Sequence, residues 1–298
     1  MDPEPQQQLT VNQCIEQIAQ KLASANLHYG HGAIDAQSEA LWIISKQLNL
    51  NPIEALDHLE DTISEDQQQN ASAVADTRIS TRKPLAYILG EAWLMGVPFY
   101  CSEQSIVPRS WIAELIVNGS LEPWLTANGK ALDLCAGNGS LAILLALSRP
   151  DIHVSACDIS MPALAIAARN LDRHSLNSQV ELLDGDLWDA LPKPNEDNLF
   201  DLIICNPPYV NATSMAALPA EYQAEPKLAL AGGDDGMDLI RRIITYAPDY
   251  LSERGAILIE IGNEYENFKK AFPQTPVIWM GASAGEEQVL LIQAEDLR

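Results

Sequence analysis

The stretch that decides the fold is Asp133–Ser140, which reads DLCAGNGS. It begins within the apolar run Ala131–Cys135 and leads into a segment with a helical pattern. Gly137 and Gly139 permit a tight turn and let a ligand approach the backbone closely. The next apolar run ends at Asp158, whose carboxylate can accept hydrogen bonds from ribose hydroxyls. This order of strand, glycine turn, helix and acid predicts a nucleotide site in an α/β domain.

From Trp111 onward, short apolar runs alternate with helical patterns, as is typical of a parallel sheet covered by helices. The runs that predict strands are Ala131–Cys135, His153–Cys157, Val180–Leu183, Leu202–Cys205, Ala256–Ile261, Val277–Met280 and Gln288–Ile292. Only a loop with Gly281 and Gly285 separates the last two runs. Because so short a loop cannot make a parallel crossover, these strands are expected to form an antiparallel hairpin at the edge of the sheet.

Residues 10–82 show helical patterns alone. Apolar side chains recur at helical spacing in two sets, Val11, Ile15, Ile18 and Leu22, then Leu41, Ile44 and Leu48. Asn51 followed by Pro52 predicts a helix start, and Ser64 with Gln67 resembles a capping box. We therefore expect a small helical bundle here.

The segment that follows, up to Pro108, is expected to contain strands and turns. Tyr87–Gly90 begins it, and Trp93–Phe99 around Gly96 predicts a β-hairpin. The expected organisation has three parts: a helical domain at 1–84, a hairpin linker at 85–110 and an α/β domain at 111–298.

The chain of 298 residues carries 18 basic and 41 acidic side chains, a net charge of -23. So acidic a chain repels phosphate backbones, which argues against a direct grip on nucleic acid and favours a basic partner. No uninterrupted apolar run of about 18 residues occurs, and no signal-like segment follows the polar first residues. We therefore expect a cytoplasmic protein without a membrane span.

The five cysteines and five histidines do not form a metal-binding pattern. No two cysteines make a C-x-x-C pair, and His28 and His31 lie in a glycine-containing turn. Cys135, Cys157 and Cys205 each lie in an apolar run, where a small buried thiol is expected. Neither a disulfide framework nor a metal site is expected.

Acidic residues gather where the predicted strands end, and they are Asp133, Asp158, Asp184 and Asp186. They would repel the two phosphates of a dinucleotide but attract a ligand with a sulfonium cation, an α-amine and a ribose. S-adenosylmethionine has these groups. Asp186 is placed to meet its adenine amino group, whereas Asp184 is expected to serve only a turn. The residues expected to bind this cofactor are Asp133, Cys135, Ala136, Gly137, Asn138, Gly139, Asp158, Asp186, Leu187 and Asn206.

The motif Asn206-Pro207-Pro208-Tyr209 follows the apolar run Leu202–Cys205. The two prolines fix the chain and lack backbone donors, so carbonyl oxygens and the amide oxygen of Asn206 are left to accept hydrogen bonds. Tyr209 adds an aromatic face. Together these groups suit a planar amino group, which offers two N–H donors and a flat π-system.

These motifs resemble the class I methyltransferases that act on planar nitrogens, and more narrowly the protein glutamine methyltransferases that act on Gly-Gly-Gln segments. The resemblance rests on the helical amino-terminal region, Tyr87–Gly90, Val107–Ser110, Asp133–Ser140, Asn206–Tyr209, Glu225-Pro226, Leu230–Gly233 and Asp235-Gly236. It covers most of the chain. It implies a Rossmann-like sheet with a terminal antiparallel hairpin, S-adenosylmethionine as cofactor, a glutamine side-chain amide as acceptor and a helical domain that docks the acceptor protein.

The segment after Val107 distinguishes two branches of this family. Enzymes that act on release factors usually carry Pro-Arg-Pro-x-Thr-Glu, whereas Pro108–Glu114 reads PRSWIAE. The segment looks like the branch that modifies the third protein of the large ribosomal subunit, although Trp111 stands where that branch often has proline. Asn138 and Ser140 also depart from the commoner Thr-Gly-Ser-Gly loop, but no glycine or acid is lost.

The resemblance assigns catalysis to Asn206, Pro207 and Tyr209. Asn206 and the carbonyl of Pro207 would hold the two amide protons, and Tyr209 would pack on the amide. Contacts with the acceptor are expected from Asn206, Pro207, Pro208, Tyr209 and Arg109. The polar segment Asn211–Gly233 would either order over the acceptor or form a plain surface excursion.

Other functions share parts of this pattern. A release-factor methyltransferase is the closest alternative. A nucleic-acid adenine methyltransferase would use the same Asn206–Tyr209 chemistry, but the acidic composition weighs against it. The set Gly137, Gly139, Ala142 and Asp158 fits a loose dinucleotide fingerprint, yet an oxidoreductase leaves Asn206–Tyr209 unexplained. A non-catalytic binder in ribosome assembly would leave Asn206 dispensable.

Overall fold

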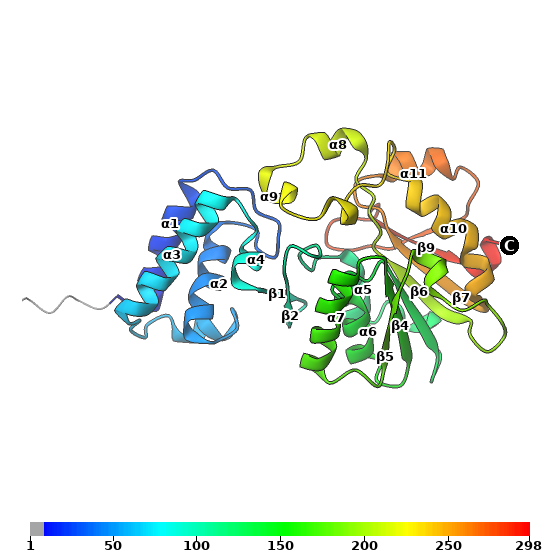
Figure 1. Cartoon of the computed structure of the whole chain (residues 1–298), viewed down its shortest axis with the longest axis horizontal. Coiled ribbons are helices and arrows are strands. Elements are labelled where there is room, and N and C mark those ends of the chain that lie inside the picture. Colours follow the sequence, from blue (N-terminus) through cyan, green and yellow to red (C-terminus); the bar gives the residue numbers. More distant parts are fainter. Residues whose placement is uncertain (1–8) are drawn as a thin grey trace, which may run out of the picture. The chain divides into compact units, whose positions relative to one another are not determined.

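The computed structural model of the chain describes residues 9–298, which fall into two units (Figure 1). The first unit runs to Gly90 and also includes Pro219–Ala224, whereas the second holds Glu91–Leu218 and Glu225–Arg298. The first unit thus extends beyond the expected boundary at residue 84. This unit also includes Pro219–Ala224, a segment distant in sequence that no sequence pattern had predicted to belong to it.

The first unit is built from helices. They are α1 (Val11–Ala23), α2 (Ala36–Leu48), α3 (Glu65–Thr81), α4 (Leu85–Leu89) and α9 (Ala220–Gln223), with a 3-10 turn, η1 (Glu54–His58). Asn51 accepts hydrogen bonds from Ile53 N and Glu54 N at the start of η1, so the predicted cap opens a 3-10 turn. Ser64 and Gln67 form the predicted capping box of α3.

The apolar stripe predicted for α1 is buried along its whole length, at Val11, Ile15, Ile18 and Leu22. On α2, Ile44 is buried as predicted, but Leu41 and Leu48 are only half-buried. Trp42 and Ile43 take their place in the core. The prediction for α2 was therefore wrong at two positions, because the buried face of the helix is centred on Trp42, Ile43 and Ile44 and leaves Leu41 and Leu48 at its margin.

The expected strand and turn at Tyr87–Gly90 is wrong, because α4 forms there instead. Leu85 and Ala86 are buried and anchor this short helix. Gly90 ends it with a left-handed φ of 68°, and its N–H donates to the carbonyl of Ala86. The glycine that suggested a turn is therefore a helix cap.

The second unit contains the predicted sheet. Its strands are β3 (Lys130–Leu134), β4 (His153–Asp158), β5 (Val180–Asp184), β6 (Phe200–Cys205), β7 (Leu251–Glu260), β8 (Ile278–Trp279) and β9 (Val289–Gln293), in the spatial order β5-β4-β3-β6-β7-β9-β8. The first five pair in parallel, and β9 pairs antiparallel with both β7 and β8. The predicted α/β class and terminal antiparallel hairpin are confirmed. The separate hairpin around Gly96 also forms, from β1 (Glu91–Leu94) and β2 (Val97–Tyr100).

Helices cover both faces of this sheet. In β6, Leu202 and Ile204 face one apolar core, and Ile203 and Cys205 face the other. The first core includes α5 (Trp111–Val117), α6 (Ser140–Ser148) and α7 (Met161–His174), and the second includes α10 (Asp238–Tyr250) and α11 (Tyr265–Ala271). Burial on both faces explains why the strands appear as continuous apolar runs. Among residues 9–298, no helix has the length and apolar character to cross a membrane.

A buried ion cluster holds Pro219–Ala224 within the first unit. Arg78 on α3 is fully buried, and its guanidinium lies 3.1 Å from a Glu39 oxygen and 3.3 Å from a Glu221 oxygen. Arg82 lies 2.9 Å from the same Glu221 oxygen, and Glu221 also accepts a hydrogen bond from His28 N. Glu221 is itself fully buried, so its charge depends on these partners.

We predict that Arg78→Met lowers the free energy of unfolding by about 3–5 kcal/mol, because it leaves two buried carboxylates without their shared cation. Urea denaturation followed by circular dichroism measures this loss. Lys21→Met is the matched control, since Lys21 pairs with Asp76, whose side chain is 64% exposed. The control should lose at most about 1 kcal/mol. Equal small losses in both variants would contradict the role given to Arg78.

Candidate cofactor and acceptor site

A pocket of about 220 Å³ opens at the carboxyl ends of the parallel strands. Cys135 follows β3, Asp158 ends β4, Asp186 follows β5 and Asn206 follows β6, and all four line this pocket. Each of four neighbouring strands therefore has, at its carboxyl end, a predicted site residue that lines the same pocket. The carboxyl ends of parallel strands meet at one edge of a sheet, which is where α/β proteins bind their ligands.

The glycine loop after β3 makes the expected tight turn. Gly137 and Gly139 have φ values of 56° and 78°, in the left-handed region. Cys135 has a φ of 62° although it carries a side chain, and such backbone strain concentrates at ligand sites. A Cβ on Gly139 would lie only 3.1 Å from the Cβ of Ala167 on α7. The loop therefore packs closely against this helix.

Asp158 is well placed to hold a ribose. Its carboxylate oxygens accept hydrogen bonds from Gly137 N and Ser160 N, each at 2.8 Å. Burial raises the pKa of Asp158, whereas these two backbone donors lower it. A carboxylate has about four acceptor sites, so two remain for ribose hydroxyls in the pocket. The chemistry of this side chain fits the ribose of S-adenosylmethionine.

Asp133 lies behind the glycine loop and does not line the pocket. One carboxylate oxygen accepts a hydrogen bond from Ala142 N in α6, at 3.0 Å. The other oxygen is buried without a hydrogen-bond partner in residues 9–298. Burial raises the pKa of Asp133 to about 8, so at pH 7 the side chain is mostly protonated. Asp133 therefore tethers β3 to the first turn of α6, and its contact with the cofactor stays a prediction.

Asp186 and Leu187 both line the pocket, and their contact with the cofactor stays a prediction. The Asp186 carboxylate lies 2.9 Å from the guanidinium of Arg242 on α10, which also lines the pocket. Any contact with an adenine amino group would therefore come from a carboxylate already paired with a cation. Leu187 is buried and has a φ of 52°, a second strained position in the pocket wall.

The remaining predicted cofactor residues lie outside the lining, and they are Ala136, Asn138 and Gly139. Asn138 is 3% exposed, and its Nδ2 donates to the carbonyl of Tyr100 at 3.3 Å. Its own carbonyl accepts from Asn170 Nδ2 at 3.0 Å. Asn138, which departs from the commoner Thr-Gly-Ser-Gly loop, therefore connects the glycine loop to Tyr100 and Asn170 through hydrogen bonds.

Several lining residues were missed by the sequence predictions. They are Gln104, Ser105, Ile106, Cys157, Ile159, Ser160, Ala163, Gly185, Pro226, Leu228, Ala229, Leu239 and Arg242. Ile159 and Ser160 directly follow Asp158, so their proximity was available from the strand end. The segments 104–106 and 226–229 are distant in sequence and carry no motif for cofactor binding. Only the folded chain brings them to the pocket.

The side-chain amide of Asn206 has a defined orientation. Its Nδ2 donates to the backbone carbonyl of Arg109 at 3.4 Å, which leaves Oδ1 to accept from another group. Pro207 and Pro208 are both buried and hold the loop after β6 in place. The hydroxyl of Tyr209 donates to Glu260 at 3.2 Å. Asn206 and Pro208 line the cofactor pocket, whereas Pro207 and Tyr209 do not.

The guanidinium of Arg109 makes an ion pair within the chain. Its Nη1 and Nη2 each lie 2.6 Å from an oxygen of Glu225, which is buried and also accepts from Val107 N. Arg109 thus meets Asn206 through its backbone carbonyl, while its charge is balanced by Glu225. A contact between its guanidinium and the acceptor stays a prediction.

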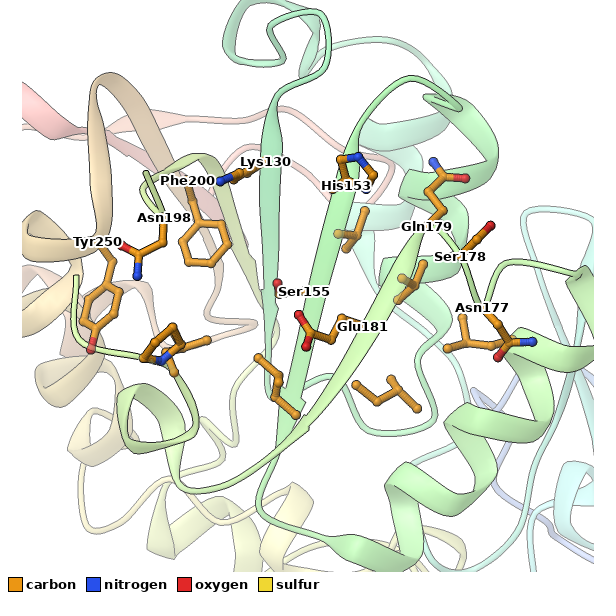
Figure 2. A pocket seen from close by; sticks show the side chains of 17 residues that line it. Lys130, His153, Ser155, Asn177, Ser178, Gln179, Glu181, Asn198, Phe200 and Tyr250 are labelled. Atoms are coloured by element: carbon orange, nitrogen blue, oxygen red, sulfur yellow. The ribbon is translucent and has the colours of Figure 1, made fainter. Parts of the chain in front are cut away.

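A larger hollow of about 740 Å³ lies elsewhere on the second unit (Figure 2). Lys130, His153 and Phe200, the first residues of β3, β4 and β6, line it. It is therefore associated with the amino ends of these parallel strands, away from the predicted site residues. Within residues 9–298, no group of three or more His, Cys, Asp and Glu side chains is arranged to hold a metal ion.

Comparisons with known proteins agree with this geometry. A family model described as Methyltransferase small domain matches residues 115–221, and one described as PrmC N-terminal domain matches residues 13–90. Together with the pocket at the strand ends, these matches define an S-adenosylmethionine-dependent methyltransferase.

Three relatives carry the name ribosomal protein uL3 glutamine methyltransferase. The one from Bordetella pertussis is 42% identical over 97% of this chain and 96% of its own length. The one from Bradyrhizobium diazoefficiens is 43% identical over 92% of this chain and 87% of its own length. The one from Neisseria gonorrhoeae is 37% identical over 98% of this chain and 97% of its own length. The chain belongs to this family of glutamine methyltransferases.

We predict that Asp158→Ala weakens binding of S-adenosylmethionine by about 1.5–3 kcal/mol, because hydrogen bonds to a charged acceptor are lost. Isothermal titration calorimetry measures this change. Asp184→Ala is the matched control, since Asp184 ends the neighbouring strand opposite Asp158 but is exposed and does not line the pocket. Cofactor affinity that is equal in the two variants would remove the ribose assignment.

Proposed function

We propose that this enzyme transfers a methyl group from S-adenosylmethionine to the side-chain amide nitrogen of a glutamine in a large-subunit ribosomal protein of the uL3 type. The single observation that carries the proposal is the acceptor-rich loop Asn206–Tyr209, which borders the cofactor pocket through Asn206 and Pro208. The printed names of the full-length relatives support the same acceptor.

The proposed mechanism depends on positioning. An amide nitrogen is a poor nucleophile because its lone pair is delocalised into the carbonyl, so alignment matters more than a strong base. Asn206 Oδ1 and the carbonyl of Pro207 accept the two amide protons and orient the nitrogen toward the pocket. These acceptors also favour the positive charge that develops on the nitrogen. Tyr209 packs on the amide. When bound, S-adenosylmethionine supplies the electrophilic methyl group.

The two units of the chain suggest a division of labour. We assign acceptor docking to the helical unit and methyl transfer to the second unit, which begins with the β1–β2 hairpin. The acceptor proposed is a basic protein, which the net charge of -23 would attract, and no direct grip on nucleic acid is proposed. A cytoplasmic enzyme fits an acceptor of this kind.

We predict that Asn206→Ala lowers methyl transfer by at least about 10²-fold, since a small misplacement of the nucleophile already has an effect of this size. Cofactor affinity should change much less, because Asp158 and the glycine loop remain. The assay is transfer of a tritiated methyl group to the purified acceptor, alongside calorimetry. In Asn206→Asp the carboxylate still accepts hydrogen bonds from the acceptor but cannot donate to the Arg109 carbonyl, so acceptor binding should survive better than in the alanine variant while methyl transfer is still lowered.

Asn177→Ala is the control for this pair, because Asn177 is an exposed amide far along the chain from the motif. We call Asn206, Pro207 and Tyr209, the residues proposed to hold the glutamine amide, the amide clamp. Normal transfer by Asn206→Ala would argue against this clamp. It would instead support a protein that binds its partner without catalysing methyl transfer.

We also predict that added salt lowers kcat/KM for the protein acceptor. Residues 1–90 carry 5 basic and 12 acidic side chains, and the remaining 208 residues carry 13 and 29. Both parts of the chain therefore attract a basic protein, and ions screen this attraction over about 8–10 Å at physiological ionic strength. Steady-state kinetics from low to high ionic strength measure the effect. A flat profile would mean that the acidic surface serves solubility alone.

A further inference from the structure

The carboxylate of Glu260 meets three hydrogen-bond donors from two separate loops. Glu260 ends β7 and is 2% exposed. Its Oε2 accepts from Ser110 Oγ at 2.5 Å and from Trp111 N at 2.9 Å. Its Oε1 accepts from the hydroxyl of Tyr209 at 3.2 Å. Because all three groups donate, this position suits a carboxylate, which only accepts, better than an amide, which also donates.

Both loops belong to the proposed amide clamp. The carbonyl of Arg109, directly before Ser110, accepts from Asn206 Nδ2 and so sets which atom of that amide is left for the acceptor. The second loop is Asn206–Tyr209 itself. Glu260 therefore contacts Tyr209 directly and constrains Asn206 through one short turn of chain.

The backbone around Tyr209 leaves little room for adjustment. A Cβ on Gly232 would lie 2.7 Å from the Cα of Tyr209, and a Cβ on Gly262 would collide with the Tyr209 ring. These glycines permit the close approach of neighbouring chain to the tyrosine. The ring is thus fixed on one side by backbone and at its hydroxyl by Glu260.

We propose that Glu260 is the positioning residue of the amide clamp, holding Tyr209 directly and Asn206 through the Arg109–Trp111 turn so that both face one acceptor amide. The proposal rests on the proposed function, because it concerns the orientation of the same acceptor group. Glu260 does not line the cofactor pocket. Its loss should therefore change the alignment of the acceptor more than the affinity for the cofactor.

The test compares Glu260→Ala, Glu260→Gln, Tyr209→Phe and the double variant Tyr209→Phe/Glu260→Gln. Glu260→Ala should lower kcat by about 10²-fold, with little change in the KM for the acceptor or in cofactor affinity. Glu260→Gln should recover part of kcat, since its amide oxygen can still accept from Trp111 N. Tyr209→Phe and Glu260→Gln should be non-additive in kcat, because they break the same hydrogen bond.

Glu264→Gln is the matched control. Glu264 is also a buried carboxyl, on the turn just after Glu260, but its hydrogen bonds go to Asn211 and Asn267. Its kcat should stay near that of the wild type. If the wild type methylates glutamine and Glu260→Ala keeps the kcat of this control, the positioning role is overturned while the proposed function stands. If the wild type methylates no glutamine acceptor, the proposed function fails and this proposal fails with it.

A second readout needs no methyl transfer. Burial raises the pKa of Glu260 to about 7 in the folded chain, from its ordinary value of 4.5. As the pH rises, the unfolded chain releases the Glu260 proton near pH 4.5, whereas the folded chain keeps it until about pH 7. Titration of Glu260 therefore lowers the stability of the wild type as the pH rises from about 4.5 to 7. Glu260→Gln lacks that proton, so its unfolding free energy relative to the wild type should rise over the same range. Because burial is the largest cause of this shift and the three donors oppose it, a difference in unfolding free energy that stayed constant over this range would overturn the buried position of the Glu260 carboxyl group.

Discussion

Buried carboxyl groups at the ends of the parallel strands hold the surrounding loops in place. Asp133, Asp158 and Glu260 each lie at or near the carboxyl end of a strand, and each accepts a backbone N–H: from the first turn of α6, from the glycine loop and from the first residue of α5, respectively. A buried carboxylate is costly unless donors surround it, and a buried N–H is costly unless it is accepted. At Asp158 and Glu260 both requirements are met together, whereas one oxygen of Asp133 has no hydrogen-bond partner in residues 9–298. The segments that build the site are therefore hydrogen-bonded to the ends of the sheet strands.

The same arrangement accounts for the charge at the pocket. Arg242, which lines the pocket, is paired with Asp186, and Arg109, whose carbonyl contacts Asn206, is paired with Glu225. Neither leaves an excess positive charge that would repel a sulfonium cation. Two carboxylates, Asp158 and Asp186, line the pocket as well. The charges of this pocket therefore suit a positively charged cofactor.

Much of the fold was predictable because short segments of sequence determine where its strands and turns form. The apolar runs of the strands and the glycine turn before α6 are short-range signals, and both the sheet and the terminal hairpin follow from them. The meeting of candidate site residues such as Asp158 and Asn206 in one pocket was predictable for the same reason, since parallel strands bring their carboxyl ends together. The error at Tyr87–Gly90 arose where one residue, glycine, serves turns and helix caps alike.

The remainder of the site depends on contacts between distant segments. The hydrogen bond between Asn206 and Arg109 joins residues 97 positions apart, and the bond between Tyr209 and Glu260 joins residues 51 apart. No local pattern in the sequence reports that such segments meet. The burial of Asp133 behind the glycine loop was missed for this reason, because the sequence places it at the strand end without showing on which side the helix closes over it.

The late arrival of Glu221 has a consequence for synthesis on the ribosome. Arg78 and Glu221 are 143 positions apart, although both belong to the first unit. At about 5–20 residues per second, the nascent chain waits roughly 7–30 seconds between making the arginine and making its second carboxylate. During that interval the guanidinium of Arg78 can pair with Glu39 but not yet with Glu221, which has not been synthesised. The amino-terminal unit of this enzyme therefore completes its polar core only after most of the catalytic unit has been translated.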